Sequence, residues 1–203
     1  MKGGSERTVG DLLEEYEGIR EMIGNGGITA TGGEPLSQLP FLTELFREAQ
    51  KRGINTCLDT SGILYSEDKR PEYEELLKYT DLVMLDIKEI DSERHRSLTG
   101  RGNGSVLAFL GLLEENIIPV WIRHVVVPGL TDSDEMHMEM GRLLGRYRNI
   151  KALDVLPYHD MGKKKYESLG IPYSLEGTES ATKEEALRAR NRILDGMRET
   201  RNG

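Results

Sequence analysis

The sequence contains very little cysteine, since Cys57 is the one thiol in 203 residues. A single cysteine excludes an internal disulfide, and one thiolate is too few to hold an iron–sulfur cluster. Long apolar runs are also missing, because none approaches the roughly 20 residues that a helix needs to cross a bilayer. The first seven residues lack the apolar stretch of a secretory signal peptide. We therefore expect a cytoplasmic protein with no membrane partner.

A surplus of positive charge is missing as well. The formal net charge is -8, with 27 Lys and Arg against 35 Asp and Glu. Binding to a nucleic-acid backbone is driven by clustered Lys and Arg, so no nucleic-acid partner is expected. The apolar residues make up 37% of the chain and the charged residues 31%, which is typical of a folded globular protein. We expect residues 1–203 to form a single domain.

Helical and strand patterns alternate along the chain. The spacing of apolar residues predicts helices over 8–23, 41–52, 72–78, 92–98, 105–116, 132–147 and 182–197. Short apolar runs predict strands over 28–31, 55–59, 81–88, 119–127 and 152–156. This alternation predicts an α/β fold with a parallel sheet. A complete eight-stranded barrel takes about 250 residues, so a partial barrel or an open sheet is expected, and the periodicity leaves both open.

Polar residues stand where each predicted strand ends. They are Gly32, Gly33 and Glu34 after the first strand, Asp59 and Thr60 at the second, Asp86 and Lys88 at the third, Arg123 in the fourth and His159 after the fifth. In both architectures ligands bind at the carboxyl ends of the strands. Burying such charges unpaired is costly, so we expect them to face a ligand, a cation or each other.

Most of these residues also have an ordinary structural explanation. The glycines suit a tight turn, Asp59 can cap the turn that follows it, and His159 suits an exposed loop. Asp86 and Lys88 are two residues apart on one predicted strand, where they could form a rim ion pair of little energetic value. Arg123 is harder to explain in this way, because Val, Ile and Trp surround it. Polar groups at five successive strand ends favour a shared ligand site.

Five segments carry a family resemblance. They are Gly32-Gly33-Glu34-Pro35 and the segments 55–62, 81–88, 120–129 and 156–159. In order and spacing they resemble the radical SAM enzymes, where SAM is S-adenosylmethionine, and in particular the enzymes that activate glycyl-radical enzymes such as pyruvate formate-lyase. The resemblance implies a partial (β/α) barrel of radical SAM type. About five parallel strands with outer helices are expected, with the family's first strand missing.

The resemblance also implies roles for the residues at the strand ends. SAM would be bound by Gly32, Gly33, Glu34, Asp86, Lys88, Arg123 and His159, with Glu34 at its methionine end and His159 against its adenosine. A monovalent cation would be bound by Asp59, Thr60, the carbonyl of Met84 and Asp86. In the family, a 4Fe–4S cluster reduced by flavodoxin or ferredoxin cleaves SAM. The resulting 5′-deoxyadenosyl radical removes hydrogen from a glycine of the partner enzyme.

The family's cluster ligands have no counterpart in this sequence. They are three cysteines spaced C-x3-C-x2-C after the first barrel strand, whereas residues 1–4 correspond to the loop beyond that motif and Cys57 stands alone. We expect an N-terminally truncated SAM-binding portion that is inactive by itself and leaves a sheet edge unpaired. One alternative is a cluster-free module that binds SAM or complements a separate fragment. Another is an unrelated barrel enzyme that uses Lys88 as a Schiff-base nucleophile.

Overall fold

The computed structural model describes residues 4–163, 166–167 and 170–203, so the loop expected at the extreme N-terminus lies almost wholly outside the described residues. The strands are β1 (Gly27–Ala30), β2 (Asn55–Thr60), β3 (Leu82–Asp86), β4 (Val120–Val126) and β5 (Ile150–Pro157). The helices are α1 (Val9–Ile23), α2 (Leu39–Lys51), α3 (Arg70–Leu77), α4 (Ser92–Thr99), α5 (Gly104–Glu115), α6 (Asp134–Leu144) and α8 (Lys183–Asn202). Three short 3-10 helices are η1 (Pro35–Gln38), η2 (Glu67–Lys69) and η3 (Asp160–Gly162). None of the described helices is long and apolar enough to cross a membrane.

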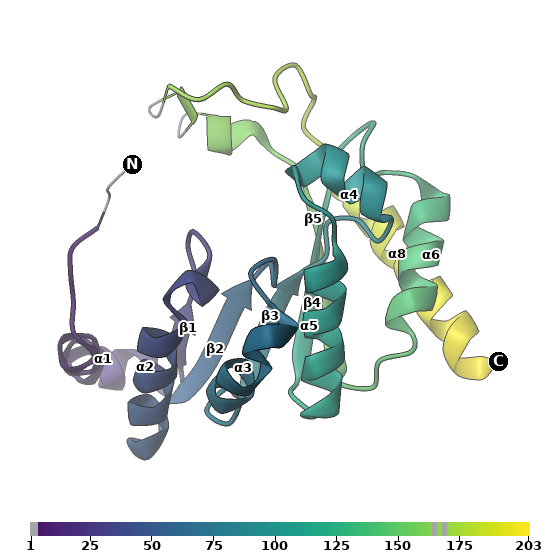
Figure 1. The fold of residues 1–203 in the computed structure, drawn as a ribbon. Helices are drawn as coiled ribbons and strands as arrows, with labels where there is room; N and C mark the ends of the chain where they lie inside the picture. The colour runs from purple at the N-terminus through teal and green to yellow at the C-terminus, as the bar shows by residue number, and fades with distance from the viewer. Residues whose placement is uncertain (1–3, 164–165, 168–169) are drawn as a thin grey trace.

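The five strands form one parallel sheet in the order β1-β2-β3-β4-β5, with helices packed along it (Figure 1). A doubly wound open sheet reverses its strand order partway, whereas a barrel adds each strand next to the previous one. The uninterrupted order therefore decides between the two architectures that periodicity left open. The predicted partial barrel with about five parallel strands is confirmed.

Most helices and strands begin and end within a few residues of the positions predicted from local sequence signals. At the start of α1, the Thr8 hydroxyl accepts a hydrogen bond from the backbone N–H of Asp11, and the Asp11 carboxylate accepts one from the N–H of Thr8. This reciprocal capping fixes the first turn of the helix. The third strand is shorter than predicted, because it ends at Asp86 and not at Lys88. The Glu89 carboxylate accepts the N–H groups of the next two residues and turns the chain toward α4.

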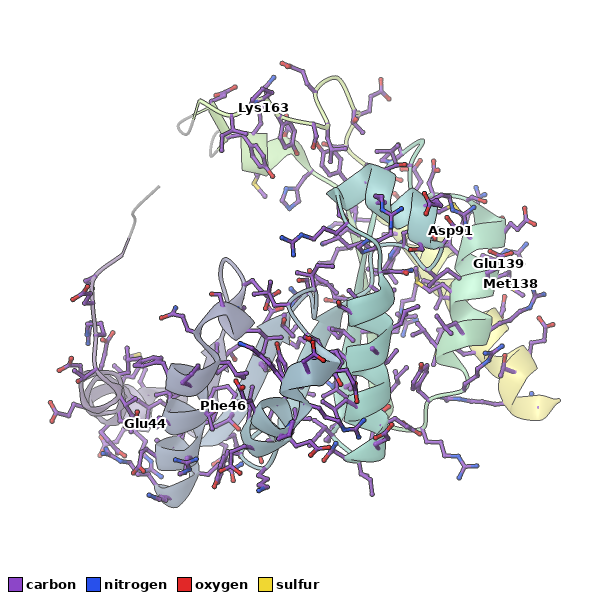
Figure 2. All side chains as sticks on the ribbon, viewed as in Figure 1. Glu44, Phe46, Asp91, Met138, Glu139 and Lys163 are labelled. Carbon is purple, nitrogen blue, oxygen red and sulfur yellow. The ribbon has the colours of Figure 1, made fainter. Side chains whose placement is uncertain are left out.

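The two faces of the sheet have different environments, because successive strand residues point to opposite sides. Leu58, Val83 and Ile122 point to the outer face and are fully buried against the helices. On α2, Phe46 is also fully buried, whereas Glu44 lies exposed on the outside (Figure 2). The inner face carries polar and larger side chains that keep partial access to solvent. The inner face is therefore open to a ligand.

Two buried histidines lie outside the strand-end set. The rings of His124 on β4 and His137 on α6 meet edge to face at 5.5 Å between centroids, and each side chain is 2% exposed. His124 bonds through Nδ1 to the carbonyl of Ile87 at 2.8 Å, and His137 through Nε2 to that of Thr131 at 2.9 Å. The second nitrogen of each ring has no partner among the described residues. Burial lowers the pKa of both histidines, which favours the neutral ring in the folded protein.

This pair predicts a stability that falls in mild acid. Below pH about 6.5 the unfolded chain takes up protons on these histidines more readily than the folded chain does, so protonation favours unfolding. The free energy of unfolding should therefore decrease as the pH falls below about 6.5, by at most about 1.4 kcal/mol per pH unit for each histidine. Urea denaturation across that range measures the slope. His124→Gln should make the slope shallower. His159→Gln alters an exposed side chain and should leave the slope unchanged. Equal slopes for the unsubstituted protein and both variants would show that the buried histidines do not cause the loss of stability in acid.

Candidate functional site

The site is centred on Arg123, which β4 places on the open inner face of the sheet. Its Nη1 donates to both carboxylate oxygens of Asp59 on β2 at 3.2 Å, and its Nε lies 4.0 Å from the carboxylate of Asp86 on β3. The three side chains are only 18% to 25% exposed. Asp86 and Arg123 are also direct partners in the parallel register. The structure thus brings together three of the predicted strand-end residues around one guanidinium group.

Lys88 completes this cluster although it lies beyond the end of β3. Its ammonium group is 3.3 Å from the Asp86 carboxylate, and its side chain is 41% exposed. The cluster of Asp59, Asp86, Lys88 and Arg123, hereafter the charge cluster, contains two carboxylates and two cations. As predicted, its charges face each other. Their remaining exposure lets a ligand with both charge signs exchange contacts with them at small desolvation cost.

The loop after β1 lies at the same edge of the sheet. Gly32 and Gly33 have φ angles of +82° and +56°, which only glycine adopts without strain. Neither position has another group within 4 Å of where a Cβ would stand. Both glycines are exposed, so their backbone can be approached closely by a ligand.

Glu34 is fully engaged within the protein. One carboxylate oxygen accepts hydrogen bonds from the hydroxyl of Thr60 and from the N–H of Leu36. The other accepts from the hydroxyl and from the N–H of Ser61, the latter at 3.1 Å. Glu34 therefore ties the glycine loop to the end of β2. In this arrangement its carboxylate holds the loop in place and leaves the backbone of Gly32 and Gly33 for ligand contacts.

Replacing this carboxylate by an amide should loosen the loop. In Glu34→Gln the amide N–H₂ must face groups that are themselves donors, so about 1–2 kcal/mol of unfolding free energy should be lost. Urea denaturation measures the change. Glu44→Gln, at an exposed position on α2, is the matched control and should have no measurable effect. If the two substitutions change the free energy of unfolding equally, the hydrogen bonds of Glu34 do not stabilise the folded protein.

The remaining predicted residues occupy different positions at this edge. The Met84 sulfur lies 3.6 Å from Nη2 of Arg123, and Thr60 is buried with its hydroxyl also accepting from the N–H of Gly62. His159 lies exposed just beyond β5, and no hydrogen bond joins it to the charge cluster in the described part of the chain. Figure 1 shows the segment that follows β5 extending above the sheet. The structure thus places His159 at the same edge without bringing it into contact.

Sequence reasoning missed polar residues beside this site. The hydroxyl of Thr31 donates to Asp59 at 3.0 Å, and Ser61 binds Glu34 as described above. Asp154 on β5 is the register partner of Arg123 and is exposed on the inner face. Its signal was available, because an acidic residue interrupts an otherwise apolar predicted strand. The two hydroxyl residues gave no comparable signal, since Ser and Thr are common at strand ends and turns.

The residues of this edge fit SAM, which is a zwitterion with a sulfonium charge, a ribose and an adenine. The charge cluster offers both signs, and the bare glycine backbone offers hydrogen-bonding groups. A 4Fe–4S cluster does not fit, because it needs several thiolates and the sequence has only Cys57. Burial raises the pKa of the Cys57 thiol, which disfavours the thiolate. Among the described residues no group of three or more His, Cys, Asp or Glu is placed to hold a metal ion.

Comparisons with known proteins agree on one family. The model of the Radical SAM superfamily matches residues 1–141. The pyruvate formate-lyase-activating enzyme of Streptococcus mutans serotype c is 42% identical over 189 residues, covering 92% of this chain and 72% of that protein. The enzyme of the same name from Staphylococcus aureus strain USA300 is 42% identical over 195 residues, covering 94% of this chain and 77% of that protein.

The fold has solved counterparts. The crystal structure of a domain of pyruvate-formate lyase-activating enzyme from Bacteroides vulgatus superposes with a TM-score of 0.68 at 22% identity. That match covers 84% of this chain and 94% of the solved chain. At this level of identity the superposition shows the shared fold.

Proposed function

Because this chain belongs to the Radical SAM superfamily and, within it, to the pyruvate formate-lyase-activating enzymes, we propose that it is the SAM-binding portion of an enzyme that generates a glycyl radical. By family it is a radical SAM oxidoreductase. The observation that carries the proposal is the charge cluster at the carboxyl edge of the sheet. Family membership excludes the alternative of an unrelated Schiff-base enzyme.

The proposed roles follow the chemistry of each group. The backbone of Gly32 and Gly33, positioned by Glu34, receives the methionine end of SAM. Asp86, Lys88 and Arg123 bind its carboxylate and ribose, and His159 closes on the adenosine. When bound, SAM supplies the adenosyl carbon that takes a hydrogen atom from a glycine of the partner, which we propose is pyruvate formate-lyase.

A monovalent cation is proposed beside SAM, bound by Asp59, Thr60, the carbonyl of Met84 and Asp86. Two neighbouring carboxylates repel each other unless positive charge lies between them. In the structure Arg123 supplies that charge, since it contacts Asp59 and lies near Asp86. A cation could take over this role when Arg123 turns toward the ligand.

The 4Fe–4S cluster of the family is the group that this chain cannot hold by itself. We propose that its thiolates, and therefore the electron received from flavodoxin or ferredoxin, act from outside residues 1–203. We also propose that these residues form one domain and act in the cytoplasm. The second candidate function, a cluster-free module that binds SAM or complements a separate fragment, is favoured by the same single cysteine.

Titration with SAM tests the proposal. Trp121 is the one tryptophan, is 42% exposed, and lies on the inner face of β4 two residues before Arg123. SAM should therefore change its fluorescence in a saturable way, and S-adenosylhomocysteine should compete. Isothermal titration provides an independent reading. If millimolar SAM causes no fluorescence change and releases no heat, both the activase portion and the SAM-binding module are refuted.

The two candidates differ in what restores catalysis. A longer chain that carries a C-x3-C-x2-C segment before residue 1 should cleave SAM if the activase proposal is right. For the cluster-free module, SAM binding should be complete in residues 1–203 and unchanged by the added segment. SAM cleavage is measured as 5′-deoxyadenosine release under anaerobic, reducing conditions.

A further inference from the structure

Ile87 lies between Asp86 and Lys88 of the charge cluster, and both of its backbone polar groups are bonded to β4. Its N–H donates to the carbonyl of Arg123 at 2.9 Å. Its carbonyl accepts a hydrogen bond from Nδ1 of His124 at 2.8 Å. Two neighbouring residues of β4 therefore hold the segment that carries the acidic and basic side chains.

The bond from His124 takes the place of a bond between strands. β3 ends at Asp86, so the carbonyl of Ile87 lies beyond the strand. Ile87 is 1% exposed, and no other group in the described part of the chain donates to this carbonyl. A buried carbonyl without a donor is costly, so the ring satisfies a group that the end of the strand leaves behind. Since Nδ1 faces a carbonyl oxygen, Nδ1 carries the ring proton.

The two bonds fix the peptide planes on either side of Ile87. A peptide group is planar, so the N–H of Ile87 sets the plane shared with Asp86, and its carbonyl sets the plane shared with Lys88. The second plane determines the direction in which Lys88 leaves the backbone. In the structure that direction places the ammonium group 3.3 Å from the Asp86 carboxylate. The ring of His124 thus controls where this ammonium group lies.

The ring of His124 is itself held in place. It is 2% exposed and meets the ring of His137 edge to face at 5.5 Å between centroids. His137 is bonded through Nε2 to the carbonyl of Thr131 at 2.9 Å. The Thr131 hydroxyl donates to the carbonyl of Val125 and accepts from the N–H of Val127, each at 2.8 Å. The ring of His124 therefore cannot turn without breaking buried contacts.

We propose that His124 is a positioning residue for SAM: without touching the ligand, it orients Lys88 through the carbonyl of Ile87. The inference rests on the proposed function, which assigns Lys88 to the carboxylate and ribose of SAM. His124 is buried on the helix-covered side of the sheet, so it acts from behind the site. When the donor is lost, the peptide plane can turn, and ordering it again on binding reduces the affinity.

Substitutions at His124 test this role by moving one hydrogen-bond donor. The amide nitrogen of asparagine is bonded to Cγ, as Nδ1 of histidine is, whereas that of glutamine is one bond farther from the backbone. His124→Asn should keep the SAM affinity within about twofold of the unsubstituted protein, whereas His124→Gln and His124→Leu should lower it about 5- to 10-fold. Affinity is read from the fluorescence of Trp121 at neutral pH, and urea denaturation shows which variants are folded.

Two results at this position would overturn the proposal. One is unchanged SAM affinity in all the folded variants, and the other is an equal loss in His124→Asn and His124→Gln. Because both of these variants carry a polar amide, their comparison decides the matter even if His124→Leu does not fold.

Two further variants distinguish positioning from a purely structural role, which would lower stability and leave the affinity of the folded protein unchanged. Ile193→Val, at a fully buried position on α8, is the matched control and should reduce stability without changing SAM affinity. In a Lys88→Ala protein, adding His124→Gln should weaken SAM binding by less than about twofold, because the residue that it positions is gone. The same loss with and without Lys88 would show that His124 does not act through it.

The outcome is separable from that of the proposed function. If the unsubstituted protein does not bind SAM, the proposed function is refuted, and the role of His124 is refuted with it. If the unsubstituted protein binds SAM and the variants at His124 bind it equally well, the positioning role alone is refuted.

Discussion

Replacing Arg123 by glutamine should lower the affinity for SAM by about 10- to 100-fold, because hydrogen bonds to charged groups contribute about 1.5–3 kcal/mol. The substitution also leaves Asp59 and Asp86 without the guanidinium group that lies between them. Their repulsion should destabilise the free protein by about 1–2 kcal/mol, less than for a fully buried pair because both carboxylates retain partial solvent access. SAM affinity is measured by fluorescence titration and stability by urea denaturation.

Two further variants separate the charge from the geometry. Arg123→Lys keeps the positive charge but loses the separate nitrogens that reach Asp59 and Asp86. Compared with Arg123→Gln, it should therefore restore more of the stability than of the affinity for SAM. Combining Arg123→Gln with Asp59→Asn removes both partners and should restore part of the stability lost in the single variant. If Arg123→Gln binds SAM with unchanged affinity, the charge cluster is not the ligand site.

Anaerobic treatment of this chain with iron and sulfide should give no 4Fe–4S absorption and no EPR signal after reduction. The physical reason is the shortage of thiolates, because Cys57 alone cannot hold a cluster and burial raises its pKa. We therefore expect the cluster absorption and the EPR signal to be absent, not merely weakened. The matched control is Cys57→Ser, which should give the same blank result and bind SAM with unchanged affinity.

A longer chain with the C-x3-C-x2-C segment provides the positive reference for this experiment. It should develop both the cluster spectrum and SAM cleavage, and Cys57→Ser in that longer chain should leave both intact. A cluster spectrum from residues 1–203 that disappears in Cys57→Ser would assign Cys57 a metal-binding role and contradict the proposal.

Several local features were predictable because they depend on residues close together in sequence. The capping pair of Thr8 and Asp11 lies within one helical turn, and it marks the start of α1 as predicted. The end of β3 was predicted two residues too late, at Lys88. That boundary depends on the Glu89 side chain folding back onto the following backbone, which periodicity does not report.

The site itself was only partly predictable. The sequence identified Arg123 as anomalous among apolar neighbours, and the structure gives it two carboxylate neighbours on different strands. The expectation that Glu34 lies at the methionine end of SAM stays a prediction, and the structure adds that its carboxylate binds Thr60, Ser61 and the backbone of Leu36. No pattern within the segment around Glu34 indicates those partners. Asp154 stands out in the sequence as an acidic residue in an apolar strand, and its register with Arg123 identifies it as a neighbour of the site.

By itself, the sequence determined the alternation of strands and helices, the polar strand ends, the family and the shortage of cysteine, because these depend on neighbouring residues and short motifs. Tertiary structure alone decided the strand order and the pairing of charges. The physical reason is distance along the chain: Arg123 meets Asp59 across 64 positions and Thr60 meets Glu34 across 26. Such contacts form only when parallel strands align at a common edge of the sheet.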